Sequence, residues 1–314
     1  MSENRSILVT GGAGYIGSIL VPTLVAQGFK VTVLDNFMFK QNSLAACCAN
    51  PDFTVVRGDA RSPEILKELV PQADIIIPLA ALVGAPLCSI DPIGAESLNL
   101  DGQLTLLDLL RDDQWVLVPI TNSGYGIGEQ GKFCTEESPL RPLSLYGQHK
   151  VQVEKVALER ENTISFRLAT VFGMAPRPRI DLLVNDFVHR AVTDRAVVLF
   201  ESHFKRNFIH IRDVTEAFLH GIRNFETMRG GPYNVGLSDA NISKFELCEK
   251  IQAHVPAFVF LEAAIGEDPD KRDYIVSNDK IEATGFKPAH SLDDGIEELI
   301  KGYTMIRNSI YGNV

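Results

Sequence analysis

Side chains able to do acid–base chemistry stand in two nearby stretches of the sequence. TNSGYGIG (121–128) follows an apolar run and carries Thr121, Asn122 and Ser123, and YGQHK (146–150) brings Tyr146 and Lys150. In a helix, residues four positions apart share a face, so Tyr146 and Lys150 would project together. A tyrosine acting as a base at neutral pH needs its pKa lowered by about three units, which is about 4 kcal/mol. The two stretches therefore predict a catalytic rim, if a cation supplies that energy.

Lys150 is the candidate for that cation. A lysine about 5 Å from the phenol oxygen would contribute about 3 kcal/mol at an effective dielectric of about 20. We therefore expect Lys150 to lower the pKa of Tyr146. The same spacing also occurs in ordinary exposed helix pairs, so the catalytic interpretation depends on a redox cofactor bound beside it.

A glycine-rich turn near the start of the chain provides such a place. Its glycines, in GGAGYIG, are Gly11, Gly12, Gly14 and Gly17. Glycines between a strand and a helix let the backbone approach a pyrophosphate, which the helix N-terminus attracts. Asp35 follows about 20 residues later, where a carboxylate accepts hydrogen bonds from a ribose diol and repels a 2′-phosphate. The motif predicts NAD over NADP, although Lys40 nearby argues the other way and glycine turns also occur without ligands.

The apolar runs indicate the fold that carries these residues. They lie at 6–10, 30–35, 53–58, 73–80, 115–120 and 164–172, and helical patterns separate them. Runs that are apolar on both faces and separated in this way are typical of a parallel sheet covered by helices. Beyond about residue 174 the alternation weakens, strand-like segments return at 207–211 and 233–236, and the chain ends in a helical pattern. The sequence predicts the α/β class, as a Rossmann-type doubly wound parallel sheet with a smaller C-terminal substrate lobe.

These patterns also predict the domain organisation. Residues 1–174 would form the dinucleotide-binding domain, with its sheet completed by about 207–238. Residues 175–206 and 239–314 would form the lobe that binds the substrate.

Composition excludes several classes of function. The net charge of −10 and the pI of about 5.2 argue against a nucleic-acid partner. The longest apolar run, 75–88, is too short and too interrupted by Pro and Gly to span a bilayer, and the start lacks the features of a secretory signal. Five cysteines without a Cys-x-x-Cys pair suit a reducing compartment, and the histidines include no His-x-x-x-His pair. We expect a cytoplasmic protein without a metal site.

Several motifs in order carry a family resemblance that covers nearly the whole chain. GGAGYIG, Asp35, GDA (58–60), LAA (79–81), Asn99, Thr121, YGQHK, FRLATVFG, RNFIHIRDV and YNVG resemble the extended short-chain dehydrogenase/reductases, which include NAD-dependent sugar-nucleotide epimerases and dehydratases. The resemblance implies that Tyr146 is the acid/base, that Lys150 contacts the nicotinamide ribose and that Thr121 bonds the reacting sugar hydroxyl. It also implies a homodimer. The implied cofactor contacts are Gly11, Gly14, Tyr15, Ile16, Gly17, Asp35, Asn36, Asp59, Ala60, Leu79, Ala80, Ala81, Asn99, Tyr146 and Lys150.

Cations in the C-terminal half are candidates for binding a nucleoside-diphosphate sugar. Arginine's planar fork suits diphosphate oxygens. The family match points to Arg206 and Arg272, and Arg177 and Arg179 are weaker candidates; each could instead be a solvated surface residue. The remaining predicted substrate contacts are Asn122, Ser123 and Asn185.

The residues after Thr121 narrow the expected chemistry. In the 4,6-dehydratases of the family an Asp and a Glu stand where this chain has Asn122 and Ser123, and the GDP-sugar 3,5-epimerases have a Cys at the place of Ser123. Neither Asn nor Ser can supply that acid/base chemistry, so we expect oxidation at C4 of the sugar with hydride transfer to NAD.

Four longer stretches suggest a subfamily. GYIGS, PLAALVGAPLC, TNSGYGIGE and EDPDKRDYIVSN resemble the GDP-manno-heptose 4-dehydrogenases of capsule pathways. A 4-epimerase similar to UDP-glucose 4-epimerases stays open. A 4-ketoreductase would usually use NADPH, against which Asp35 argues, and a non-enzymatic NAD sensor would not need Thr121, Tyr146 and Lys150 together.

Overall fold

The computed structural model describes residues 5–263, 265–266 and 271–306. Its centre is a seven-stranded sheet in which every neighbouring pair of strands is parallel, with the order β11-β7-β5-β4-β1-β2-β3. Its strands are β1 (Ser6–Thr10), β2 (Lys30–Asp35), β3 (Phe53–Arg57), β4 (Ile75–Pro78), β5 (Trp115–Thr121), β7 (Thr163–Leu168) and β11 (Gly231–Val235). The predicted Rossmann-type sheet is confirmed.

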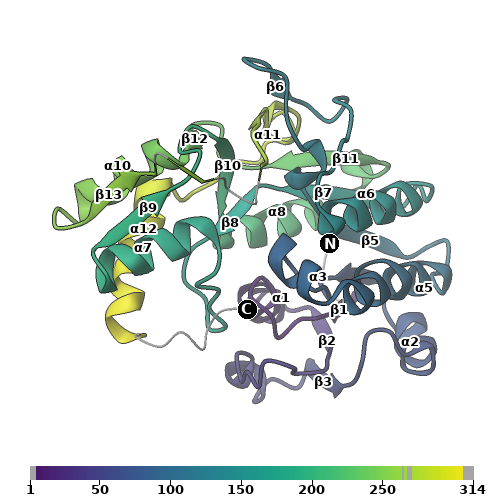
Figure 1. The fold of residues 1–314 in the computed structure, drawn as a ribbon. Helices are drawn as coiled ribbons and strands as arrows, with labels where there is room; N and C mark the ends of the chain where they lie inside the picture. Colours follow the sequence, from purple (N-terminus) through teal and green to yellow (C-terminus); the bar gives the residue numbers. More distant parts are fainter. Residues whose placement is uncertain (1–4, 264, 267–270, 307–314) are drawn as a thin grey trace.

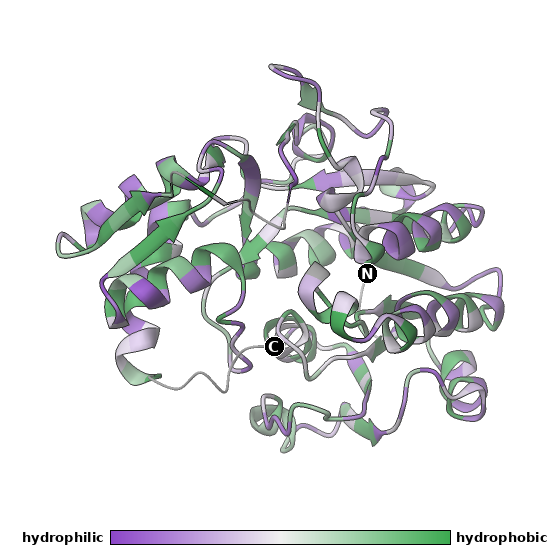
Figure 2. Cartoon of the chain, in the orientation of Figure 1, coloured by the Kyte–Doolittle hydropathy of each residue, from purple (hydrophilic) through white to green (hydrophobic). Residues whose placement is uncertain are grey.

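Helices cover both faces of this sheet. On β1, Ile7 and Val9 belong to a core with α1 and α8, whereas Leu8 belongs to a separate core with α2 and α5. Hydrophobic residues accordingly run along the central strands, as Figure 2 shows. The α-helices of this part are α1 (Gly17–Ala26), α2 (Pro63–Leu69), α3 (Ala85–Ile90), α4 (Pro92–Glu96), α5 (Gly102–Asp108), α6 (Leu145–Ala157), α8 (Ile211–Arg223) and α9 (Phe225–Met228). The 3₁₀-helices are η1 (Ala45–Cys47), η2 (Val70–Gln72) and η4 (Asn122–Tyr125), and η3 (Ser97–Asp101) is a π-helix.

A second group of elements forms a lobe beside the sheet (Figure 1). Its small sheets have the orders β12-β10-β8, β13-β9 and β14-β6. Its strands and helices are β6 (Phe133–Cys134), β8 (Thr170–Phe172), β9 (Ala196–Leu199), β10 (Lys205–His210), β12 (Asn241–Ser243), β13 (Val259–Glu262), β14 (Ile275–Val276), α7 (Leu183–Thr193), α10 (Lys244–His254), α11 (Asp279–Glu282) and α12 (Leu292–Met305).

Two expected strands differ from the structure. The apolar run 164–172 is not one strand: it divides at Ala169 into β7, in the large sheet, and β8, which pairs with β10. The bond from the N–H of Ala169 to the carbonyl of Val235, at 2.9 Å, is the last of the pairing between β7 and β11, and from Thr170 onward the chain pairs with β10 instead. Within the expected segment 207–238, β11 joins the large sheet, whereas β10 pairs with β8 and β12.

Two further observations concern the membrane and the cysteines. In the described part of the chain, no helix has the length and apolar character that a bilayer span requires. The five cysteines all lie in that part and none forms a disulfide.

Candidate active site

One cleft lies where the carboxyl ends of β1, β2, β4 and β5 lead into loops. Ligands of doubly wound proteins bind at this edge of the sheet. Most of the predicted site residues line it: Gly11, Gly14, Tyr15, Ile16, Gly17, Asp35, Asn36, Asp59, Ala60, Leu79, Ala80, Ala81, Thr121, Ser123, Tyr146, Lys150, Arg177, Arg179 and Arg272. The other four, Asn99, Asn122, Asn185 and Arg206, are not among its described lining residues.

The glycine turn between β1 and α1 forms the floor of the cleft. Gly11 has a φ of +68°, and a Cβ there would lie 2.6 Å from the backbone of Ala80. At Gly17 a Cβ would overlap the carbonyl oxygen of Gly12. The turn therefore packs directly on the loop after β4, and only glycine leaves backbone accessible to a pyrophosphate at these positions.

Asp35 closes one side of this turn. Its Oδ2 accepts from the N–H of Ala13 at 2.9 Å and its Oδ1 from the N–H of Phe37 at 2.8 Å. Burial raises the pKa of the Asp35 carboxyl, and these two N–H donors oppose the rise. Each carboxylate oxygen can accept a further hydrogen bond. The arrangement fits a ribose diol, so the turn and Asp35 together suit NAD.

Two other residues of the predicted cofactor site, Asp59 and Asn99, already have hydrogen-bond or ion-pair partners within the protein. Asp59 lines the cleft and forms an ion pair with Arg61 at 2.6 Å, which lowers the pKa of the Asp59 carboxyl. The side chain of Asn99 is buried and bonds the N–H and the C=O of Leu82 at 2.7 and 2.8 Å. Asn99 thus holds the loop that follows Ala81.

Helix α6 brings Tyr146 and Lys150 to the same cleft. Ser144 caps the helix, since its Oγ accepts from the N–H of Gly147 at 3.2 Å. The Lys150 ammonium donates to the carbonyl oxygen of Pro119 at 3.0 Å. Burial lowers the pKa of Lys150 to about 8.

The structure does not show the expected lowering of the Tyr146 pKa by Lys150. Burial raises the pKa of Tyr146 to about 12, and the cations that oppose this rise are Arg179 and Arg272. The physical reason is twofold: the phenol is desolvated, and the lysine ammonium is bonded to a strand carbonyl. An activated tyrosine therefore needs additional positive charge, such as an oxidised nicotinamide would bring.

A short hydrogen-bonded chain runs from Thr121 into the substrate side of the cleft. The Thr121 hydroxyl accepts from the N–H of Ser123 at 3.1 Å and donates to the Ser123 hydroxyl at 2.9 Å. Arg272 also donates to that Ser123 oxygen. Asn122 points elsewhere: it is buried, and both polar atoms of its amide lack a hydrogen-bond partner among the described residues.

Three of the predicted arginines line the cleft and the fourth lies behind it. Arg177 stacks over the ring of Phe39, with 4.2 Å to the ring centroid, and Arg179 pairs with Asp181. Arg206 is buried, donates to the carbonyl of Lys205 at 3.0 Å and lies 5.8 Å from the centroid of the Tyr274 ring. Because Tyr274 lines the cleft, Arg206 reaches it through that ring.

Asn185 has a supporting position. Its Oδ1 accepts from the N–H of Gly173 at 3.1 Å, and its amide nitrogen donates to the carbonyl of Arg179 at 2.8 Å. These bonds fix the loop that carries the cleft arginines.

Several lining residues are absent from the sequence-based prediction, among them Met38, Phe39, Gln41, Val83, Gly84, Ser144 and Tyr274. Ser144 has a readable signal, because a serine just before a helical run is a preferred N-cap. Phe39 and Tyr274 stand on loops without a periodic pattern, so nothing in the sequence places them at the cleft.

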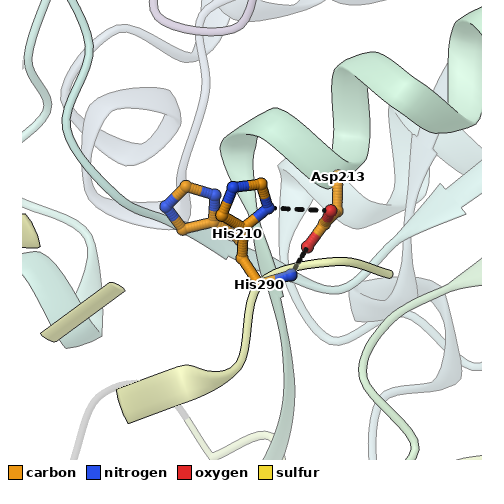
Figure 3. A group of neighbouring side chains, drawn as sticks. All are labelled: His210, Asp213 and His290. Carbon is orange, nitrogen blue, oxygen red and sulfur yellow. Dashed lines mark hydrogen bonds and ion pairs between the residues drawn. The ribbon is translucent and has the colours of Figure 1, made fainter. Parts of the chain in front are cut away.

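A second group of titratable side chains lies outside the cleft (Figure 3). His210, Asp213 and His290 each bring a potential ligand atom within 4.8 Å of the others. Asp213 accepts from the N–H of Ala289 at 2.9 Å and of His290 at 3.0 Å, and His210 Nε2 lies 2.9 Å from Glu298. These bonds tie α8, β10 and α12 together, which indicates a structural role.

Known proteins similar to this chain agree with this geometry. The sequence profile of the NAD dependent epimerase/dehydratase family matches residues 7–236. The low-salt glycan biosynthesis protein Agl12 of Haloferax volcanii is 30% identical, over 95% of this chain and 98% of its own length. A putative UDP-glucose 4-epimerase of Methanocaldococcus jannaschii is 26% identical, over 94% of this chain and 97% of its own.

Solved structures are similar over the same extent. DesIV, the dTDP-glucose 4,6-dehydratase of Streptomyces venezuelae solved with NAD and TYD bound, is 26% identical with a TM-score of 0.84, covering 96% of this chain and 98% of its own. The UDP-glucose 4-epimerase of Thermus thermophilus, solved with NAD, has a TM-score of 0.80 at 24% identity, over 95% of this chain and 99% of its own. The chain therefore belongs to the NAD dependent epimerase/dehydratase family, and it is an enzyme of this kind with NAD as its cofactor.

Proposed function

We propose that the protein oxidises C4 of a nucleoside-diphosphate sugar, as a 4-dehydrogenase of a GDP-heptose or a related sugar in surface polysaccharide biosynthesis. One observation carries the proposal: Thr121, Tyr146 and Lys150 line one cleft, and none of its described lining residues on β5, on α6 or in the loop after β5 is a carboxylate. Among the described lining residues the carboxylates are Asp35, which ends β2, and Asp59, which follows β3, and both strands lie in the half of the sheet away from β5.

The residues have distinct roles in this reaction. Bound NAD supplies the acceptor for the hydride, which carries both electrons of the C4–H bond. Tyr146 receives the proton of the C4 hydroxyl, since its phenol lines the same cleft as Thr121 whereas the other titratable group of α6 in the cleft, Lys150, bonds the carbonyl of Pro119. Arg179 and Arg272 favour its deprotonated form, and Lys150 fixes α6 against β5 and contacts the ribose.

Dehydration would need a carboxylate near Thr121 and Tyr146, and the described lining residues include none on β5 or α6. Glu129 is exposed and pairs with Lys132 at 2.6 Å, and Glu136 accepts from the N–H of Asn234 at 2.7 Å. Neither is among the described lining residues. The chemistry therefore stops at the 4-keto sugar or at products that form from it without an acid/base pair.

A 4-epimerase is the second candidate, and the similarity to the putative UDP-glucose 4-epimerase favours it. Epimerisation uses the same oxidation and returns the hydride to the other face of C4. An Arabidopsis thaliana UDP-glucuronic acid decarboxylase is also 26% identical, and a sugar with a C6 carboxylate would lose carbon dioxide after the same oxidation. A 4-ketoreductase remains disfavoured, because Asp35 opposes the 2′-phosphate of NADPH.

The substrate lobe belongs to the same proposal. We assign residues 175–206 and 239–314 to the binding of the nucleotide sugar, with Arg177, Arg179, Arg206 and Arg272 near its diphosphate. Ser123 would face the sugar, Asn122 would act from behind the cleft lining, and Asn185 would act through the loop that it holds.

Assembly and location are also proposals. A homodimer is supported by apolar side chains on α3 and α4, where Ile90 is 71% and Ile93 81% exposed. Light scattering after size-exclusion chromatography would test it, since the Ile90→Ser/Ile93→Ser variant should run as a monomer. The five free cysteines support a cytoplasmic location.

The decisive first experiment identifies what the protein carries. The purified protein would be denatured, and mass spectrometry would identify the released nucleotides and the redox state of NAD. A guanosine diphosphate sugar supports the heptose proposal, whereas a uridine diphosphate sugar supports the epimerase.

A further inference from the structure

The segment 173–182 connects β8 to α7 and carries two cleft arginines, Arg177 and Arg179, so we call it the arginine loop. It begins at Gly173, whose φ is +114° and where a Cβ would lie 2.6 Å from Nε2 of the His210 ring. A left-handed backbone without room for a side chain requires glycine. The loop therefore leaves β8 in one defined direction.

Two side chains hold the backbone of Gly173. The hydroxyl of Tyr15, in the glycine turn, donates to the Gly173 carbonyl at 2.6 Å, and a carbonyl can only accept, which fixes the direction of this bond. Asn185 Oδ1 accepts from the N–H of Gly173 at 3.1 Å, and its Nδ2 donates to the Tyr15 oxygen at 3.3 Å. The same Nδ2 donates to the carbonyl of Arg179 at 2.8 Å. Burial raises the pKa of Tyr15, so its hydroxyl keeps the proton that it donates.

Arg179 is held at both ends as a result. Its backbone carbonyl belongs to this buried network, and its Nε donates to Oδ1 of Asp181 at 2.9 Å. The side chain lines the cleft together with Tyr146, and one Nη would lie 3.9 Å from a Cβ at Gly84, in the loop before α3. The guanidinium of Arg179 is therefore fixed at the part of the cleft where the base lies.

Several charged or titratable groups surround the Tyr146 phenol. Burial raises the pKa of Tyr146 and Cys88 on α3 raises it further, whereas Arg179 and Arg272 lower it. Lys150, on the same helix, donates to a strand carbonyl. Because a Coulomb interaction weakens with distance, a displacement of Arg179 would leave the tyrosinate less favoured.

We propose that Tyr15 is a positioning residue for the oxidation, and that its hydroxyl, through Gly173 and Asn185, keeps the arginine loop in the place where Arg179 faces the base. This inference rests on the proposed role of Tyr146 as the base of C4 oxidation. Tyr15 belongs to the turn that suits the cofactor, and the arginine loop leads into the substrate lobe. One hydroxyl thus joins the two halves of the site, and it transfers no proton.

Hydrogen exchange tests whether the hydroxyl holds the loop. Tyr15→Phe removes the hydroxyl and keeps the ring in its apolar contacts. In protein loaded with NAD, amides of the arginine loop should exchange about threefold to tenfold faster in Tyr15→Phe, while those of β1 keep their rates. Tyr233→Phe, the same change at a buried tyrosine outside the described cleft lining, is the control and should leave the loop unaltered. Unchanged exchange of the loop in Tyr15→Phe would overturn the inference.

The pH profile tests whether the loop acts on the base. Nicotinamide reduction in a single turnover would be followed with GDP-mannose, UDP-glucose, UDP-N-acetylglucosamine and the sugar that co-purifies. In Tyr15→Phe the pH of half-maximal oxidation should rise by about half a pH unit to one pH unit, because less positive charge faces Tyr146. The rate should fall about threefold to tenfold below that pH and match the wild type within about twofold above it. General structural damage would lower the rate at every pH.

A double variant shows whether Tyr15 acts through Arg179. Arg179→Gln should shift the profile upward at least as far as Tyr15→Phe does. Tyr15→Phe/Arg179→Gln should shift it no further than Arg179→Gln alone. Tyr15 has no positioning role for Tyr146 if the two shifts add, or if Tyr15→Phe loosens the loop without moving the profile.

Failure of the proposed function gives a different result. If the wild type oxidises none of these sugars, the proposed function is wrong, and the ultraviolet absorbance of tyrosinate in NAD-loaded protein decides the inference. The signal of Tyr146 is the difference between a protein and its Tyr146→Phe counterpart. Tyr146 should ionise at a higher pH in Tyr15→Phe than in the wild type, and equal midpoints would refute the inference.

Discussion

The ammonium group of Lys150 donates a 3.0 Å hydrogen bond to the carbonyl oxygen of Pro119, two residues before Thr121 on β5. The bond holds the catalytic helix α6 on the strand that carries the Thr121–Ser123 chain. It also places a buried cation where water does not solvate it, which is why the pKa of Lys150 is lowered to about 8. The position of Lys150 therefore has a cost in stability that depends on pH.

The first prediction concerns that cost. The folded pKa of Lys150 lies at about 8 and its ordinary value is 10.5, so between these values the unfolded chain binds the proton that the folded protein has lost. Stability from this group therefore rises with pH across that window, by roughly 2 to 3 kcal/mol. Urea unfolding without NAD, repeated across this pH window, should show that the free energy of unfolding of the wild type rises by this amount relative to that of Lys150→Met. The exposed Lys155→Met on the same helix is the control, and a constant difference between wild type and Lys150→Met would contradict the prediction.

The second prediction concerns the base. Tyr146→Phe should keep the fold and the affinity for NAD but lower turnover by at least about a hundredfold, which is the usual effect of removing an acid/base group. Steady-state rates and NAD binding by calorimetry would measure both. Tyr233→Phe, another buried tyrosine that does not line the cleft, is the control. Turnover of Tyr146→Phe within a few-fold of the wild type would remove Tyr146 from the mechanism.

Asp35 gives the third prediction. Asp35→Asn keeps the shape but removes the charge that faces the ribose, so NAD affinity should fall by about 1 to 2 kcal/mol and the preference over NADP should narrow. Calorimetric titrations with both dinucleotides would show this. Asp59→Asn also changes a cleft carboxylate, but one paired with Arg61, and should leave the preference unchanged. If Asp35→Asn kept the preference of the wild type for NAD over NADP, the ribose that distinguishes the two cofactors would not lie beside Asp35.

Arg206 gives the fourth prediction. Losing its charge next to the diphosphate should weaken binding of the nucleotide sugar by about 1.5 to 3 kcal/mol and leave NAD binding nearly constant. Arg206→Ala would be titrated with GDP and with NAD, beside Arg190→Ala, whose ion pair with Asp186 lies on α7. Equal losses for both ligands would mean that the substrate lobe is wrongly placed.

The strands β1, β2, β4 and β5 could be predicted from the sequence because most of their residues are buried on both faces, whereas the edge strand β3 has exposed side chains. β1 and β2 begin and end where their apolar runs do, at Ser6–Thr10 and Lys30–Asp35. The short strands of the lobe could not be predicted, since β9 (AVVL) and β13 (VFLE) are only four residues long and pair with each other although they are far apart in sequence. The division of 164–172 depends on the pairing of its second part with β10, which is distant in sequence.

The candidate site also has a part that the sequence predicts and a part that it does not. Residues fixed by a local motif, such as the glycine turn, Asp35, Tyr146 and Lys150, lie at one cleft as their spacing predicts. Directions of hydrogen bonds and charges could not be predicted. No pattern indicates that Lys150 binds Pro119, or that Arg272 reaches Ser123 from a loop 149 residues later.

The central claim is that the chemistry goes no further than oxidation at C4, because Asn122 and Ser123 stand after Thr121 where elimination needs carboxylates. The most direct measurement is mass spectrometry of nucleotide sugars incubated with the enzyme and NAD, with Tyr146→Phe as the inactive control. We predict a product that has lost two hydrogens, with turnover sustained by a keto acceptor, or an unchanged mass if the enzyme epimerises. A product that has lost one water would contradict the account, because a carboxylate would then have to act at a carbon beside C4.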